Sequence, residues 1–103
     1  MAGSRGSGSD VARIRRRLRE IVKTVTGRMT PERNCLFMRR WFEGGSPGEL
    51  RLIAGCTEDK VPQLKKQIGT QFSAVCADLL DTGALSQGDV DLVLRYVGRY
   101  LRP

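Results

Sequence analysis

The amino-acid sequence predicts an all-α protein, a compact bundle of about five helices in which four are long and one is short. Apolar residues recur with helical period in successive segments, and helix-start signals precede those segments. No run of alternating β-branched residues and no Asn-Gly turn predicts a strand pair. Because the connections are short, neighbouring helices should pack antiparallel. We expect a flexible Gly/Ser-rich tail over residues 1–9 and a single helical domain over residues 10–103.

The first two helices are predicted over residues 10–26 and from about residue 30 to 42. Asp10 offers an N-cap to the first helix, and an apolar stripe of helical spacing follows it. In the second helix, Thr30 is predicted to cap the N-terminus, with Pro31 at the first helical position. Each segment ends at a glycine-containing turn, so a helix boundary is expected there.

The next two helices are a short one and the longest one. Ser46 and Glu49 have the spacing of a capping box, which predicts a short helix to about Ala54. The longest element is expected over residues 58–80. Pro62 must lie in its first turn, because further inside the helix it would remove a backbone hydrogen bond and clash.

The last helix is predicted to open at a second capping box, formed by Ser86 and Asp89, and to end before Pro103. The apolar faces of the helices predict a shared core. Its expected members are Leu18, Val22, Phe37, Trp41, Ile68, Phe72, Val75, Val97 and Leu101.

The residues that usually carry enzymatic chemistry are scarce. The chain contains no histidine, which removes the commonest general base and metal ligand. Cys35, Cys56 and Cys76 are widely spaced, which is typical of core thiols in a reducing, intracellular compartment and not of a zinc site. The acidic residues near helix starts are explained by capping and the helix dipole. We therefore expect no enzyme, no metal and no cofactor.

The charge is strongly uneven along the chain. Residues 1–40 hold eleven Lys or Arg and three Asp or Glu, a net charge of +8, whereas the remaining residues sum to −1. This asymmetry favours a polyanionic partner for one end of the molecule. Charges also interrupt every apolar stretch, so no membrane-spanning helix is expected. The apolar face of the first helix has no Trp or Phe to anchor it at a membrane surface, so no membrane partner is expected either.

The first helix carries five arginines within seven residues, and guanidinium groups bind phosphates through two parallel hydrogen bonds. Arg15 and Arg19 flank its apolar stripe, while Arg13, Arg16 and Arg17 lie opposite. We expect a small nucleic-acid-binding protein, with RNA favoured, that recognises phosphates and shape with little sequence dependence. The predicted nucleic-acid-binding residues are Arg13, Arg15, Arg16, Arg17, Arg19, Lys23, Arg33, Arg39 and Arg40.

The main alternative is a helical adaptor or complex subunit whose basic first helix docks on an acidic protein partner. Carboxylates and phosphates attract the same arginines, so the sequence leaves this alternative open, as it does a plain solvated face. Leu36, Leu80 and Leu92 lie off the apolar faces of their helices, and a cluster of the three would form a self-association patch. A homodimer is therefore a further hypothesis.

Overall fold

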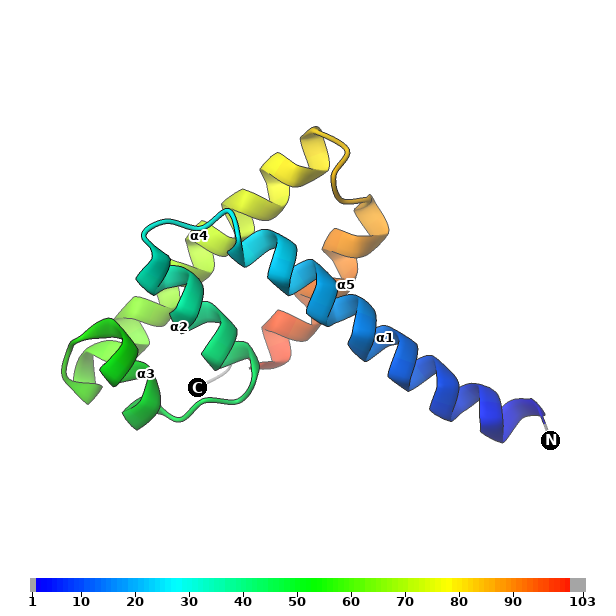
Figure 1. Cartoon of the computed structure of the whole chain (residues 1–103), viewed down its shortest axis with the longest axis horizontal. Helices are drawn as coiled ribbons and strands as arrows, with labels where there is room; N and C mark the ends of the chain where they lie inside the picture. Colours follow the sequence, from blue (N-terminus) through cyan, green and yellow to red (C-terminus); the bar gives the residue numbers. More distant parts are fainter. Residues whose placement is uncertain (1, 101–103) are drawn as a thin grey trace.

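The computed structural model describes the backbone of residues 2–100 and the side chains of residues 11–95. It contains no strand in this part of the chain, and its helices confirm the predicted all-α bundle (Figure 1). In chain order the elements are α1 (Ala2–Thr26), α2 (Glu32–Phe42), α3 (Pro47–Ala54), the 3-10 turn η1 (Glu58–Lys60), α4 (Val61–Asp81) and α5 (Gln87–Tyr100).

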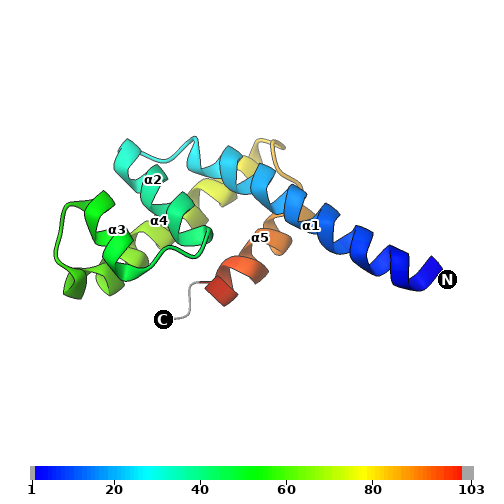
Figure 2. The same cartoon turned by 60° about the horizontal axis from the view of Figure 1, so that its bottom comes forward.

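The helices pack around α1, α2 and α4. The C-terminal half of α1 contacts α2, α4 and α5, while α3 lies against α2 and the start of α4. The N-terminal half of α1 projects away from the other helices, which gives the molecule its long axis of 51 Å (Figures 1 and 2). The part of α1 that packs is therefore the part that carries most of its apolar stripe.

The start of α1 differs from the prediction. The helix begins at Ala2 and passes through Asp10, which was expected to be its N-cap. Extending an existing helix avoids the cost of nucleation, so the packed turns after Asp10 support further turns before it even in a Gly/Ser-rich segment. A helical backbone does not show how much a segment moves, so the flexibility of residues 1–9 stays a prediction.

The start of α2 also differs. Pro31 occupies the N-cap position, no side chain caps the helix, and Glu32 is the first helical residue. The Thr30 side chain was expected to cap α2, but it is the Thr30 carbonyl that is engaged, accepting a hydrogen bond from Gln71 Nε2 at 2.6 Å. The loop before α2 is thus held by α4 and not by a local cap.

Both predicted capping boxes are present. The Ser46 hydroxyl accepts a hydrogen bond from the Glu49 backbone N–H, and the Glu49 carboxylate accepts one from the Ser46 N–H. Ser86 and Asp89 make the same pair of bonds at the start of α5, with N–O distances of 3.1 and 3.2 Å. Gly55 ends α3 in the left-handed conformation, at φ 67°, where a side chain would be strained.

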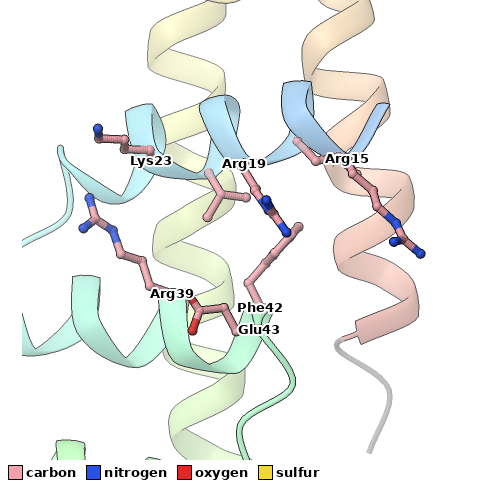
Figure 3. A pocket seen from close by; sticks show the side chains of 8 residues that line it. Arg15, Arg19, Lys23, Arg39, Phe42 and Glu43 are labelled. Carbon is pink, nitrogen blue, oxygen red and sulfur yellow. The ribbon is translucent and has the colours of Figure 1, made fainter. Parts of the chain in front are cut away.

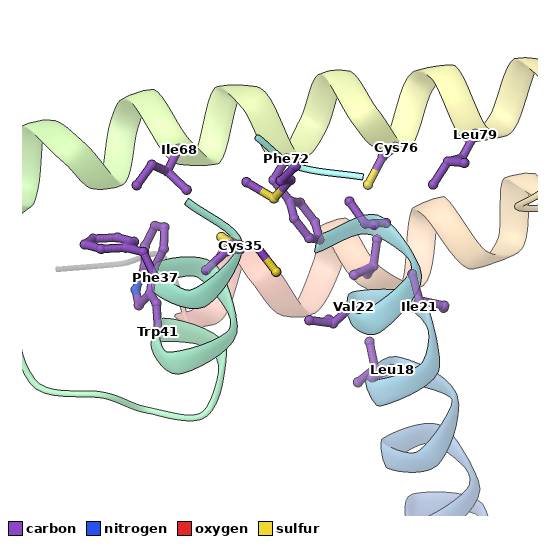
Figure 4. Close-up of a cluster of buried hydrophobic side chains, with 14 of the residues drawn as sticks. Leu18, Ile21, Val22, Cys35, Phe37, Trp41, Ile68, Phe72, Cys76 and Leu79 are labelled. Atoms are coloured by element: carbon purple, nitrogen blue, oxygen red, sulfur yellow. The ribbon is translucent and has the colours of Figure 1, made fainter. Parts of the chain in front are cut away.

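The core lies where α1, α2 and α4 meet (Figure 4). The predicted members with described side chains are buried, except Val75, which is half-buried and packs against the core. Val97 and Leu101 lie outside the described side chains. The buried predicted residues are Leu18, Val22, Phe37, Trp41, Ile68 and Phe72.

The leucines of α2, α4 and α5 differ in their exposure. Leu94 of α5 is 41% exposed, because α5 is turned so that Val90 and Val93 enter the core. Leu80 and Leu92 pack partly against the core, and Leu36 alone of the three proposed patch residues is exposed. The patch suggested as a self-association surface is therefore not formed by these three leucines.

Candidate functional site

A groove of about 550 Å³ runs between α1 and α2 and collects several of the predicted basic residues (Figure 3). Its floor contains Leu18 and Val22 of α1 and Phe42 of α2. Both α1 residues are nearly fully buried, so the accessible part of the groove is formed mainly by the charged side chains above them. Among the described residues, its basic members are Arg15, Arg19, Lys23 and Arg39, and its one acidic member is Glu43.

Three of these cations form a row on α1. Arg15, Arg19 and Lys23 are spaced four residues apart, so they follow one another along one side of the helix. The row spans roughly 12 Å along the helix axis. All three side chains are exposed, and none has a hydrogen bond or ion pair within the described part of the chain. Their charges are therefore available to a ligand.

The fourth cation comes from the opposite wall. Arg39 of α2 donates from Nε to Thr26 Oγ1 at 2.9 Å, and Thr26 is itself buried at the end of α1. Figure 3 shows Arg39 reaching towards Lys23, and Arg19 reaching across from α1 towards Phe42. Cations from two helices thus converge on one groove, with Glu43 at its edge.

Arg17, which was predicted to face solvent with Arg13 and Arg16, instead joins α1 to α5. Its guanidinium donates from Nε and Nη2 to the two carboxylate oxygens of Asp89, at 3.0 and 2.6 Å, and from Nη1 to Glu20 at 3.0 Å. These hydrogen bonds raise the pKa of Arg17 and lower that of Asp89. The charge of Arg17 is already neutralised by two carboxylates.

Arg40 of α2 is likewise paired with two carboxylates. It donates to the Glu49 carboxylate through Nε and Nη2 and to Glu43 through Nη1. The Glu49 pairing raises the pKa of Arg40, and Arg40 lowers that of Glu49. Arg33 donates to the Ala54 carbonyl at 3.2 Å and lines a different, smaller cavity enclosed by α2, the end of α3, η1 and α4. Neither residue belongs to the α1–α2 groove.

Arg13 and Arg16 are exposed on α1 and have no hydrogen bond or ion pair within the residues described. They do not line the groove. The structure therefore brings together four of the nine predicted residues, leaves two on the outer side of α1 and engages three in contacts within the protein.

The groove floor could not be predicted from the sequence. Leu18 and Val22 were expected only as members of the core. One signal was present, because Arg15 and Arg19 were the arginines that flank the apolar stripe. Residues at the border of a buried stripe lie beside the neighbouring helix, whereas those opposite it face solvent.

Within the described residues there is no group of three or more His, Cys, Asp or Glu placed to hold a metal ion. Among the same residues, no helix combines the length and apolar character needed to cross a bilayer. Comparisons with protein-family models, with curated proteins and with solved structures found no match.

Proposed function

We propose that this protein binds nucleic acid, RNA in preference to DNA, by seating a phosphate backbone in the α1–α2 groove. The observation that carries the proposal is the row of Arg15, Arg19 and Lys23, exposed and unpaired within the described residues, facing Arg39 across the groove. The length of the row, roughly 12 Å, corresponds to about three to four nucleotides of one strand at the axial spacing of B-DNA.

The burial of Phe37 and Trp41 supports recognition of phosphates over recognition of bases, whereas Phe42, which is half-buried, lines the groove itself. Phe37 is fully buried and Trp41 nearly so, so neither is a platform on which an unpaired base could stack. Recognition through phosphates and shape is typical of proteins that bind duplex RNA, whose bases are poorly accessible in the deep major groove. Binding should therefore depend weakly on sequence.

The test is a fluorescence-anisotropy titration of short duplex RNA, duplex DNA and an acidic peptide. The double variant R15Q/R19Q removes two unpaired groove charges and should weaken RNA binding roughly tenfold or more at low salt. The matched control R28Q/R51Q removes two exposed arginines outside the groove and should have a much smaller effect. Lack of micromolar binding to either nucleic acid would overturn the proposal, as would equal effects of the two variants.

The second candidate is an adaptor that binds an acidic amphipathic helix of a partner protein. The observation that favours it is Val11, which is 49% exposed and lies one helical turn before Arg15 on the same side of α1. An apolar contact beside a basic row suits a helix that is apolar on one face and acidic along its edges. Binding of the acidic peptide without binding of RNA would select this candidate.

A further inference from the structure

A second groove, of about 500 Å³, lies between α2 and α4. Lys65, Lys66, Gly69, Thr70 and Ser73 of α4 line it, and Trp41 of α2 contributes to its wall. Lys66, Thr70 and Ser73 are exposed. The Thr70 hydroxyl already donates to the Lys66 carbonyl at 2.9 Å, so the donors that the groove offers are the lysine ammonium groups and the Ser73 hydroxyl, beside Gly69, which has no side chain.

The charged side chains that line this groove, among the described residues, are both lysines. Residues 60–77 contain three lysines and no aspartate or glutamate, and no carboxylate lines the groove among the described residues. Lysine, threonine and serine are side chains that commonly contact phosphate oxygens in nucleic-acid complexes. The lysines of this groove therefore complement the negative charge of a phosphodiester backbone. They do not complement another cationic surface, such as a second copy of α1.

One of the lysines is held in place. The Nζ of Lys65 lies 5.1 Å from the centroid of the Trp41 ring, within the range of a cation–π interaction. A phosphate that draws Lys65 away would change the surroundings of Trp41, which is the single tryptophan of the chain. Its emission would therefore report on this groove directly.

The two grooves lie on different sides of α2. Arg39 lines the first groove and Trp41 the second, and two residues along a helix are separated by about 200° of rotation. Helix α2 is thus a wall shared by both grooves. A nucleic-acid segment seated in one groove leaves the other accessible.

We infer that the α2–α4 groove is a second site for a phosphate backbone, so that one molecule holds two nucleic-acid segments at once. This inference rests on the proposed function and extends it from a single contact to a bridge. Each segment is bound by its own basic groove, and α2 separates them.

The experiment mixes two short RNA duplexes, one carrying a donor and one an acceptor fluorophore, and measures energy transfer as the protein is added. Transfer should rise, then fall in excess protein, and each molecule should bind two duplexes. The variant K66E/T70E adds carboxylates to exposed positions of the second groove, so binding should fall to one duplex and transfer to background. The control R51E/A84E makes the same change of charge at exposed positions outside both grooves and should preserve bridging.

Tryptophan emission gives an independent readout. In R15Q/R19Q, which disables only the first groove, duplex RNA should still change Trp41 emission, and K66E/T70E should abolish that change. Binding of a single duplex without energy transfer by the unmodified protein would overturn the second site and leave the proposed function standing. Absence of any RNA binding would instead remove the proposed function itself.

Two other outcomes would also overturn the inference. One is bridging that survives K66E/T70E while circular dichroism shows the variant folded. The other is a change from dimer to monomer mass in K66E/T70E, measured by light scattering, because the α4 surface would then join two copies of the chain.

Discussion

Arg17 of α1 and Asp89 of α5 form an ion pair through two parallel hydrogen bonds, although they are 72 residues apart in the sequence. Asp89 also accepts the Ser86 N–H of its capping box, so one carboxylate both starts α5 and fixes it to α1. Its side chain is only 15% exposed, whereas that of Arg17 is 45% exposed. The pair therefore belongs to the structural framework of the bundle.

The first prediction concerns pH and this pair. Arg17 lowers the folded-state pKa of Asp89, so the stabilisation is present above the unfolded pKa, about 3.9, and is lost as pH falls through the folded value. R17Q should reduce the free energy of unfolding by roughly 0.5–1 kcal/mol at pH 7, since the pair is partly exposed. Urea denaturation should show that this difference disappears under strongly acidic conditions. R13Q, which removes an unpaired arginine, is the control; an equal loss for R17Q at both pH values would contradict the pairing.

The second prediction concerns the core. Phe72 is fully buried in α4, and F72A should lower the free energy of unfolding by about 3–5 kcal/mol, because it removes buried apolar area and leaves a cavity. L36A, at an exposed position of α2, should change it by less than about 0.5 kcal/mol. Thermal and urea denaturation measure both. A near-native melting temperature for F72A would mean that α4 does not bury this face.

The third prediction concerns the thiols. Burial raises the pKa of Cys76 to about 11, so it is almost entirely protonated at neutral pH. Cys35 is also buried, whereas Cys56 is half-buried. In the folded protein, iodoacetamide should modify Cys56 first and the other two only on unfolding. Mass spectrometry of the modified peptides would show this order, and rapid modification of Cys76 in the native state would contradict its burial.

The fourth prediction concerns salt. Three to four phosphate contacts in the α1–α2 groove should give a slope of log affinity against log salt of roughly −2 to −4, and R15Q/R19Q should reduce its magnitude by about 1.4–1.8. Anisotropy titrations on duplex RNA at several salt concentrations measure both slopes. A slope that R15Q/R19Q leaves unchanged would place the phosphate contacts outside this groove.

The fifth prediction is a gain in affinity. Within the part of the chain whose side chains are described, Glu43 is the one carboxylate that lines the α1–α2 groove, so E43Q should strengthen RNA binding about two- to threefold at low salt by removing a repulsion. E20Q removes the same charge from the outer side of α1, beside Arg17, and should have a smaller effect. Titrations of both variants at one salt concentration compare their gains in RNA affinity. Equal gains would indicate only a change in net charge.

The sequence was most informative where a structure depends on residues close in the chain. The capping boxes at Ser46 and Ser86 each depend on a partner three residues away, and both were predicted correctly. The cap at Thr30 was wrong because its environment is set by Gln71 on another helix. Cap hydrogen bonds between residues close in the sequence can thus be predicted from it, unless a residue of a distant element provides a better hydrogen-bond partner.

The same limit applies to the candidate site. Periodicity separated Arg15 and Arg19 from the arginines opposite the apolar stripe, but it could not show that α2 would supply Arg39 across a groove. Nor could it show that Arg17 would meet Asp89, because that contact depends on how α1 crosses α5. The number of basic residues was evident from the sequence, whereas the number left without a partner depends on tertiary packing.

The hydrogen bond from Arg39 to Thr26 makes the two walls of the α1–α2 groove unlike each other. The Thr26 hydroxyl also donates to the Val22 carbonyl at 2.6 Å, so Arg39 is attached to a fixed, buried group. Much of the rotamer freedom of Arg39 has therefore been given up on folding, while Arg15, Arg19 and Lys23 must each be ordered when a ligand arrives. The α2 wall is preorganised and the α1 wall is adaptable, which lets one groove hold a fixed anchoring point and still follow backbones of different curvature.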